Sequence, residues 1–303
     1  MLPPDLMQET FYPLGFPVTI ATNSQAVLDA AHVEWDSWRQ VFDEPPVRFT
    51  FHVSHERSPL PETSSFHAHG HQFVFAVDAN NLGICDTSTH SGVAWITTSV
   101  AEDATFFRYH LLEGMALEML VSLHLTPFHA GCVARQGRGA LLCGDSEAGK
   151  SSLSYACARR GWTYLSDDAC YLLRRCASER IVLGHPHRVR LRPDAPRLFP
   201  ELAGLVPIKR GNGKMSLDVR TTHLQSSPRT AVDRIVLLRR TDRNQLTRVD
   251  PQLARDLCEP IFYWWDPRIS SEQQSSFDAL LSQCEVFSLD YSNPDSALDL
   301  LER

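Results

Sequence analysis

The sequence predicts an α/β protein in two parts, a β-rich α+β part over residues 1–125 and an α/β part over residues 126–303. Three observations support this prediction. Polar and apolar residues alternate along several short stretches of the first part. Apolar residues then recur at helical spacing up to about residue 125. Beyond that point, two short apolar runs lead into the motif Gly144-x-x-x-x-Gly149-Lys150-Ser151.

The first part is expected to consist mainly of strands, at residues 11–21, 47–53, 71–78 and 92–100. A loop rich in Pro and Ser is predicted over residues 54–65. A helix capped by Asn23 or Ser24 is predicted to run to Trp35. A second helix is predicted from Phe106 to about Leu125, where Pro127 stops it.

Composition and charge restrict the class of protein. Hydrophobic residues make up 43% of the 303-residue chain and charged residues 21%, as in ordinary globular proteins. The net charge of −7 argues against a general nucleic-acid-binding protein. We expect no membrane association, because no run approaches roughly 18 apolar residues. The N-terminus lacks a secretory pattern and the 8 cysteines form no CxxC pairs, so we expect reduced core thiols in a cytoplasmic protein.

The second part is predicted to begin with strands over residues 129–134 and 139–144, joined by a tight turn. A helix is then predicted over residues 150–160, ended by Gly161 at the position after the helix where glycine is favoured. Two further strands are expected on either side of the pair Asp167-Asp168. This order places the glycine-rich motif between a strand and a helix.

A glycine-rich loop in this position predicts a phosphate-binding site. Backbone amides at a helix start, with the helix dipole behind them, bind anionic oxygen, and glycine lets the backbone approach phosphate closely. Lys150 would neutralise the β- and γ-phosphates, and the Ser151 hydroxyl would bind magnesium. The alternative is a strand–turn–helix corner with a surface lysine. The predicted nucleotide-binding residues of the loop are Gly144, Asp145, Ser146, Glu147, Ala148, Gly149, Lys150, Ser151 and Ser152.

The pair Asp167-Asp168 follows the predicted helix at the end of an apolar run. Adjacent residues of a strand point to opposite sides, so one carboxylate can face a metal ion while the other faces an acceptor hydroxyl. The alternative for two adjacent aspartates is a solvated turn. Together with the loop, the pair predicts phosphoryl-transfer chemistry.

Residues 128–173 resemble the kinase domain of HPr kinase/phosphorylase and its relatives, whose fold is shared with phosphoenolpyruvate carboxykinase. The resemblance rests on three marks in order: His129-Ala-Gly, the loop GDSxxGKS, and RRGWxxLSDD. It implies that Lys150 and Ser151 serve ATP and Mg²⁺. It also implies that one aspartate is the general base on a serine hydroxyl and the other supports the metal. We assign the base to Asp167 and the metal to Asp168, although the spacing alone does not decide between them.

The resemblance further places His129 near the phosphates, as a catalytic residue; the alternative for His129 is a hydrogen-bonded core histidine. The chain departs from the family at Glu147, where glycine is most frequent, and it lacks a clear match to the second glycine-rich signature. Glu147 puts an anion near a phosphate site, where it either points to solvent or weakens nucleotide binding. The missing second signature argues against HPr as the acceptor and against phosphorylase activity. The family often assembles into rings, so a homo-oligomer is a further expectation.

The expected function is therefore an ATP- and Mg²⁺-dependent kinase acting on a hydroxyl, of a serine in a peptide or protein, or of a small metabolite. The alternatives are a nucleotide-binding regulatory module and an ATP hydrolase without an acceptor. Arg210 and Lys214, around the glycine loop 211–213, are candidates to close over the γ-phosphate, or they form a solvated turn. His67, His69 and His71 could share one strand face as metal ligands, but no carboxylate or cysteine stands nearby and Gly70 predicts a turn.

Overall fold

The computed structural model describes residues 6–60, 64–204, 208–209, 214–257 and 265–303. Within these ranges the chain is a mixed α/β protein with three β-sheets, two of which combine parallel and antiparallel strands. It divides into two compact units. The first comprises the described residues of Met1–His124 and Tyr263–Ser270, and the second those of Leu125–Phe262 and Ser271–Arg303.

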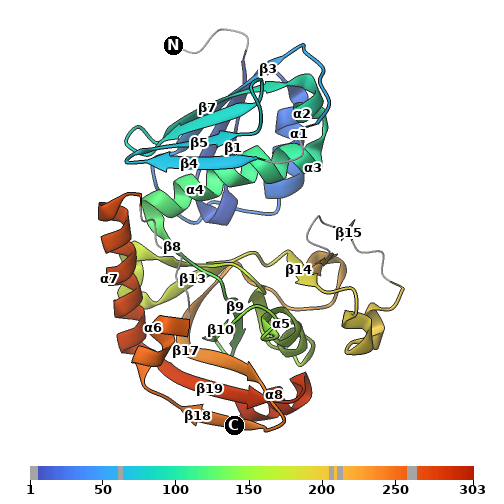
Figure 1. Ribbon diagram of the computed structural model, residues 1–303, viewed down its shortest axis with the longest axis vertical. Helices are drawn as coiled ribbons and strands as arrows, with labels where there is room; N and C mark the ends of the chain where they lie inside the picture. The colour runs from blue at the N-terminus through green and yellow to red at the C-terminus, as the bar shows by residue number, and fades with distance from the viewer. Residues whose placement is uncertain (1–5, 61–63, 205–207, 210–213, 258–264) are drawn as a thin grey trace. The chain divides into compact units, whose positions relative to one another are not determined.

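The first unit is a seven-stranded sheet with the strand order β1-β2-β3-β7-β6-β5-β4 and with helices on one face (Figure 1). Its strands are β1 (Met7–Phe11), β2 (Val18–Thr22), β3 (Val47–Ser54), β4 (Ser65–His69), β5 (Gln72–Ala76), β6 (Leu82–Asp86) and β7 (Ser91–Thr97). Its helices are η1 (Pro13–Gly15), α1 (Gln25–Trp35), α2 (Thr98–Glu102), α3 (Ala104–Phe107), η2 (Arg108–Leu112) and α4 (Glu113–His124).

The core of the first unit lies between the sheet and these helices. In β3, Phe49 and Phe51 are buried while the intervening residues are more exposed, which is the alternation that the sequence predicts for this strand. The ring of Phe51 contacts that of Phe107 in α3, with centroids 5.3 Å apart. The sheet therefore buries one face against the helices.

One strand boundary predicted near the end of this region is wrong. The strand predicted over residues 92–100 ends at Thr97, where the side chain of Asn81 accepts the Thr97 amide at 2.7 Å, and α2 begins at Thr98. The helix predicted to end at about Leu125 ends at His124, as expected. Pro127 lies instead in β8 (Leu125–Phe128), which ends the strand order of the second sheet; an edge strand tolerates the missing amide.

The second unit contains a nine-stranded sheet in which β10 (Arg138–Cys143), β17 (Arg229–Arg240) and β19 (Glu285–Tyr291) run parallel to one another. The main strand order is β11-β9-β10-β17-β13-β12-β8. The other strands of this sheet are β9 (Gly131–Arg135), β11 (Thr163–Ser166), β12 (Cys170–Leu173), β13 (Ile181–Gly184) and β18 (Gln245–Arg248). A small antiparallel sheet consists of β14 (Arg188–Leu191), β15 (Ile208–Lys209) and β16 (Met215–Asp218).

Helices cover both faces of the nine-stranded sheet (Figure 1). Leu142 packs on the face covered by α5 (Lys150–Arg159) and α8 (Pro294–Leu301), whereas Leu141 and Cys143 face α6 (Pro251–Leu257) and α7 (Pro267–Gln283). This alternation of side chains places one layer of helices on each face of the sheet, so the unit has three layers. Helix α5 confirms the helix predicted over residues 150–160. The short helices of the second unit are η3 (Arg174–Glu179), η4 (Ala195–Arg197), η5 (Pro200–Leu202) and η6 (Val219–Thr221).

Six of the 8 cysteines are buried and free of disulfides, which confirms the expectation that most are core thiols; they are Cys85, Cys132, Cys143, Cys157, Cys170 and Cys284. Burial raises the pKa of the Cys284 thiol to about 12, which keeps it protonated and unreactive at neutral pH. In the described part of the chain, no helix combines the length and the apolar character needed to span a membrane.

Candidate active site

The candidate site lies at one edge of the nine-stranded sheet. The loop after β10 leaves this edge, and the acid pair follows β11, whose antiparallel partner β9 begins at the same edge. His129 stands two residues before β9. The strand pairing therefore brings together three segments that the sequence singles out separately.

The loop between β10 and α5 has a backbone that requires glycine. Gly144 and Gly149 adopt φ values of 151° and 98°. A Cβ atom on Gly149 would lie 2.1 Å from the Tyr291 hydroxyl oxygen, so no side chain fits there. The Tyr291 hydroxyl donates to the Ala148 carbonyl at 2.6 Å. These contacts hold the loop against the end of β19.

The start of α5 presents amides toward this edge. The first helical hydrogen bond of α5 runs from the Leu153 amide to the Gly149 carbonyl at 2.8 Å. The amides ahead of it, from Lys150 to Ser152, are not used by the helix, as at every helix N-terminus. Together with the helix dipole they favour an anion.

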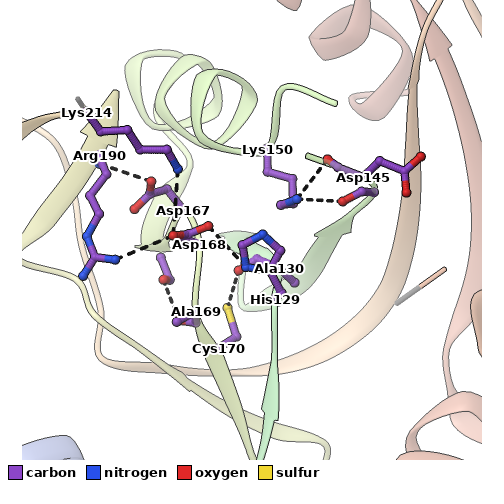
Figure 2. A network of polar contacts seen from close by, with 12 residues as sticks. His129, Ala130, Asp145, Lys150, Asp167, Asp168, Ala169, Cys170, Arg190 and Lys214 are labelled. Atoms are coloured by element: carbon purple, nitrogen blue, oxygen red, sulfur yellow. Dashed lines mark hydrogen bonds and ion pairs between the residues drawn. The ribbon is translucent and has the colours of Figure 1, made fainter. Parts of the chain in front are cut away.

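The Lys150 side chain reaches back to the loop that precedes α5 (Figure 2). Its side chain is buried, with 6% of the residue exposed, and its ammonium donates to the carbonyl oxygens of Gly144 at 2.6 Å and Asp145 at 3.1 Å. Burial lowers the pKa of Lys150, and the nearby Asp168 carboxylate works against that shift. The ammonium is therefore bound by two backbone carbonyl groups, and the oxygens of an anionic ligand could take their place.

The two aspartates have different surroundings. Asp167 is 3% exposed, and its carboxylate accepts the Tyr164 hydroxyl and the Arg190 amide, each at 3.1 Å. Burial raises the pKa of Asp167, and a hydrogen bond from Ser151 opposes the shift. Asp167 is therefore a buried carboxylate beside the serine of the glycine-rich motif.

Asp168 points to the open side, as expected for adjacent residues at a strand end. One of its oxygens lies 3.3 Å from His129 Nδ1. The other lies 3.6 Å from the guanidinium of Arg190 and 3.9 Å from the ammonium of Lys214 (Figure 2). His129 is about two-fifths exposed, so it is a residue of the site rather than a core histidine.

These groups line a cavity of about 470 Å³. Of the residues predicted from the sequence, those in its wall are His129, Ser146, Glu147, Gly149, Lys150, Ser151, Ser152, Asp168 and Lys214. Asp167, Gly144, Asp145 and Ala148 are not among the residues that line the cavity. Arg210 lies outside the described residues.

Sequence reasoning missed three arginines of the cavity, Arg190, Arg192 and Arg240. A signal for the first two exists, because arginines alternate with apolar residues from Arg188 to Arg192 and so share one face of a strand. Arg240, at the end of β17, carries no local signal. Among the described residues, five cationic and three anionic side chains line the cavity, so it carries a net positive charge even with neutral His129.

Glu147, the residue that departs from the resembled family, has a positive φ of 69°. Its carboxylate pairs with Arg192 at 2.6 Å, with the two side chains 69% and 61% exposed. The loop therefore carries its own counter-ion for one of the cavity arginines. The pair is exposed, so it contributes little to stability.

The three-histidine alternative gains no support. His67 and His69 are exposed in β4, and His71 follows the turn at Gly70. In the described part of the chain, no group of three His, Cys, Asp or Glu side chains is placed to hold a metal ion.

No family model and no curated protein matches the chain. One matching solved structure is that of the Hpr(Ser) kinase/phosphatase from Coxiella burnetii, with a TM-score of 0.30 and 13% sequence identity. The match covers 58% of this chain and 93% of that chain. This is a distant likeness that assigns neither family nor function, so the geometry of the site has to carry the functional proposal.

Proposed function

We propose that the chain is an ATP- and Mg²⁺-dependent kinase that transfers the γ-phosphoryl group to a hydroxyl group, of a serine in a peptide or protein, or of a small metabolite. One observation carries the proposal: Lys150, the start of α5 and Asp168 line the same cavity. Its volume of about 470 Å³ suits a ligand of nucleotide size. Phosphoryl transfer depends chiefly on placement and charge neutralisation, which this set of groups can provide.

The phosphate-binding loop of the proposal is Gly144–Ser152. Its amides and Lys150 would bind the β- and γ-phosphates of ATP. Lys150 would exchange the carbonyls of Gly144 and Asp145 for phosphate oxygens, which satisfy an ammonium better because they are charged. Lys214, on the far side of Asp168, would neutralise charge on the transferred group.

Magnesium would be held by Ser151 and Asp167. Mg²⁺ takes oxygen ligands and commonly uses one or two protein groups together with waters and substrate phosphates. The Ser151 hydroxyl is hydrogen-bonded to the Asp167 carboxylate, so hard oxygen donors already lie together at the helix start. Bound there, the ion would neutralise charge on the β- and γ-phosphates. This assignment replaces Asp168, which the sequence analysis paired with Ser151.

Asp168 would then be the general base. Its carboxylate is the one that faces the cavity, and contacts with Arg190 and His129 hold it in place. It would accept the proton of the acceptor hydroxyl as the hydroxyl oxygen bonds to the γ-phosphorus and the bond to the diphosphate breaks. His129 would orient Asp168 from the opposite side to Arg190.

The test mixes the protein with γ-labelled ATP, magnesium and serine peptides or small hydroxy compounds. Labelled acceptor supports the kinase; release of phosphate alone supports an ATP hydrolase, and binding without either supports a regulatory module. Lys150→Ala should abolish binding or turnover. Arg160→Ala, at the other end of α5 and paired with Asp299 at the surface, is the matched control and should leave both unchanged. Activity that persists in Lys150→Ala refutes the site.

A further inference from the structure

The cavity wall also includes Arg240 at the end of β17, to which the kinase proposal gives no role. Arg240 is the last residue of β17 and pairs in register with Tyr291, the last residue of β19. Both strands run parallel to β10, so these residues lie at the sheet edge from which the phosphate-binding loop departs. Ligands of α/β sheets bind at this carboxyl edge.

Both side chains stand directly against the loop. The Arg240 Nε and Nη2 atoms lie 3.2 Å from the position that a Cβ on Gly149 would take. On the same face of β17, Leu238 packs with the buried side of α5, which sets the direction of Arg240. The Tyr291 hydroxyl holds the Ala148 carbonyl at 2.6 Å. Arg240 thus reaches the start of α5 across Gly149, which has no side chain.

The positive charge of Arg240 is poorly compensated by the groups around it. It lies at the positive end of α5, and its contacts are with Tyr291, whose ring centroid is 5.9 Å from the guanidinium carbon. Among the described residues, Arg240 has no ion-pair partner, whereas the adjacent Arg239 pairs with Asp290 at 2.8 Å. An anionic ligand in the cavity would satisfy this guanidinium.

The strand order indicates which part of the ligand Arg240 would meet. In the order β11-β9-β10-β17, the acid pair follows β11 and Arg240 ends β17, on opposite sides of β10. Transfer requires the γ-phosphoryl group to face Asp168. The remainder of the nucleotide then extends along the loop toward Arg240.

We propose that Arg240 binds the diphosphate portion of the nucleotide, the part that remains as product, and that Tyr291 positions both Arg240 and the loop. The proposal rests on the proposed function, because it takes the ligand to be a nucleoside triphosphate. It separates the cations of the cavity into two groups. Arg190 and Lys214 act at the transferred group, and Arg240 acts at the group left behind.

The test measures the affinities of ATP and ADP by calorimetry for the unchanged protein, Arg240→Gln, Arg240→Lys and the control Arg239→Gln. Loss of a charge-assisted contact should weaken ATP and ADP alike, by about 10- to 100-fold. Arg240→Lys should recover part of the affinity, since it keeps the charge without the planar fork. Arg239→Gln should change neither affinity, because Arg239 does not line the cavity and its guanidinium is paired with Asp290.

A loss confined to ATP, or no loss in Arg240→Gln, overturns the proposal and leaves the kinase function standing. If the unchanged protein binds neither nucleotide, both proposals fail. Urea unfolding of each variant shows whether a loss of affinity is a loss of fold: an Arg240→Gln variant as stable as Arg239→Gln that binds both nucleotides weakly supports the assignment.

Discussion

Replacing Asp168 by asparagine separates transfer from nucleotide binding. The substitution keeps the size of a side chain that faces the cavity and removes its charge and its capacity to accept a proton. Loss of a general base commonly lowers a rate by about 10²- to 10⁴-fold. ATP affinity should hold or rise, because Asp168→Asn removes an anion from the wall of an anion site.

The reciprocal change, Asp167→Asn, should impair magnesium-dependent ATP binding, which Asp168→Asn should leave intact. Asp167 lies beside Ser151 and does not line the cavity, and its two oxygens accept from Tyr164 and Arg190. An amide can satisfy only part of these donors, and it is a poorer magnesium ligand than a carboxylate. We expect weaker ATP binding in the presence of magnesium, with little change in its absence.

The assay combines label transfer to an acceptor that the unchanged protein phosphorylates with calorimetric ATP affinity, with and without Mg²⁺. Each variant serves as the control for the other, because the two aspartates are adjacent and chemically identical. If Asp167→Asn abolishes transfer while magnesium-dependent affinity persists, Asp167 is the base, as the sequence first indicated. That result would refute the assignment of the general base to Asp168, which rests on Asp168 being the aspartate that lines the cavity.

Three further predictions concern the loop and the buried acid. Glu147→Gln should tighten ATP binding, by about two- to fivefold in calorimetry, because it releases Arg192 from an exposed ion pair; weaker binding would contradict this. Tyr291→Phe should lower the free energy of unfolding by about 1–2 kcal/mol in urea titrations, since the Ala148 carbonyl loses its donor, and an unchanged midpoint would speak against that role. Asp167 has a raised pKa, so its ionisation costs native stability as pH rises above its ordinary value of 3.8. The stability of Asp167→Asn relative to the unchanged protein should therefore improve from acid to neutral pH, and a pH-independent difference would exclude that cause.

The elements that sequence analysis predicts well are those whose signals are local. The strand before Gly144 and the helix after Gly149 are confirmed by β10 and α5, because alternation, glycine and helical spacing all fall within a few residues. The central strand β17 escaped prediction. It joins β10 and β19 in parallel pairs, and such pairing between distant segments leaves no trace in a local pattern.

The candidate site likewise has some parts that can be predicted from the sequence and others that cannot. The loop and the acid pair are visible in the sequence because each is a contiguous motif, and the structure brings both to one cavity, although their chemical roles stay predictions. Which aspartate faces the cavity could not be predicted, since it depends on how β11 meets its neighbours. Arg240 could not be predicted either, because its partners Gly149 and Tyr291 come from other strands and loops.

The loop of this chain already contains the partners that a phosphate would displace. Lys150 is satisfied by the loop carbonyls and Arg192 by Glu147, so two cavity cations are held in place without a ligand. An exposed ion pair contributes only about 0.2–1 kcal/mol, so exchanging the Glu147 carboxylate for a phosphate costs little. Glu147 therefore does not argue against the proposed nucleotide binding: its carboxylate pairs with Arg192 beside the cavity, and an anion of higher charge could replace it there.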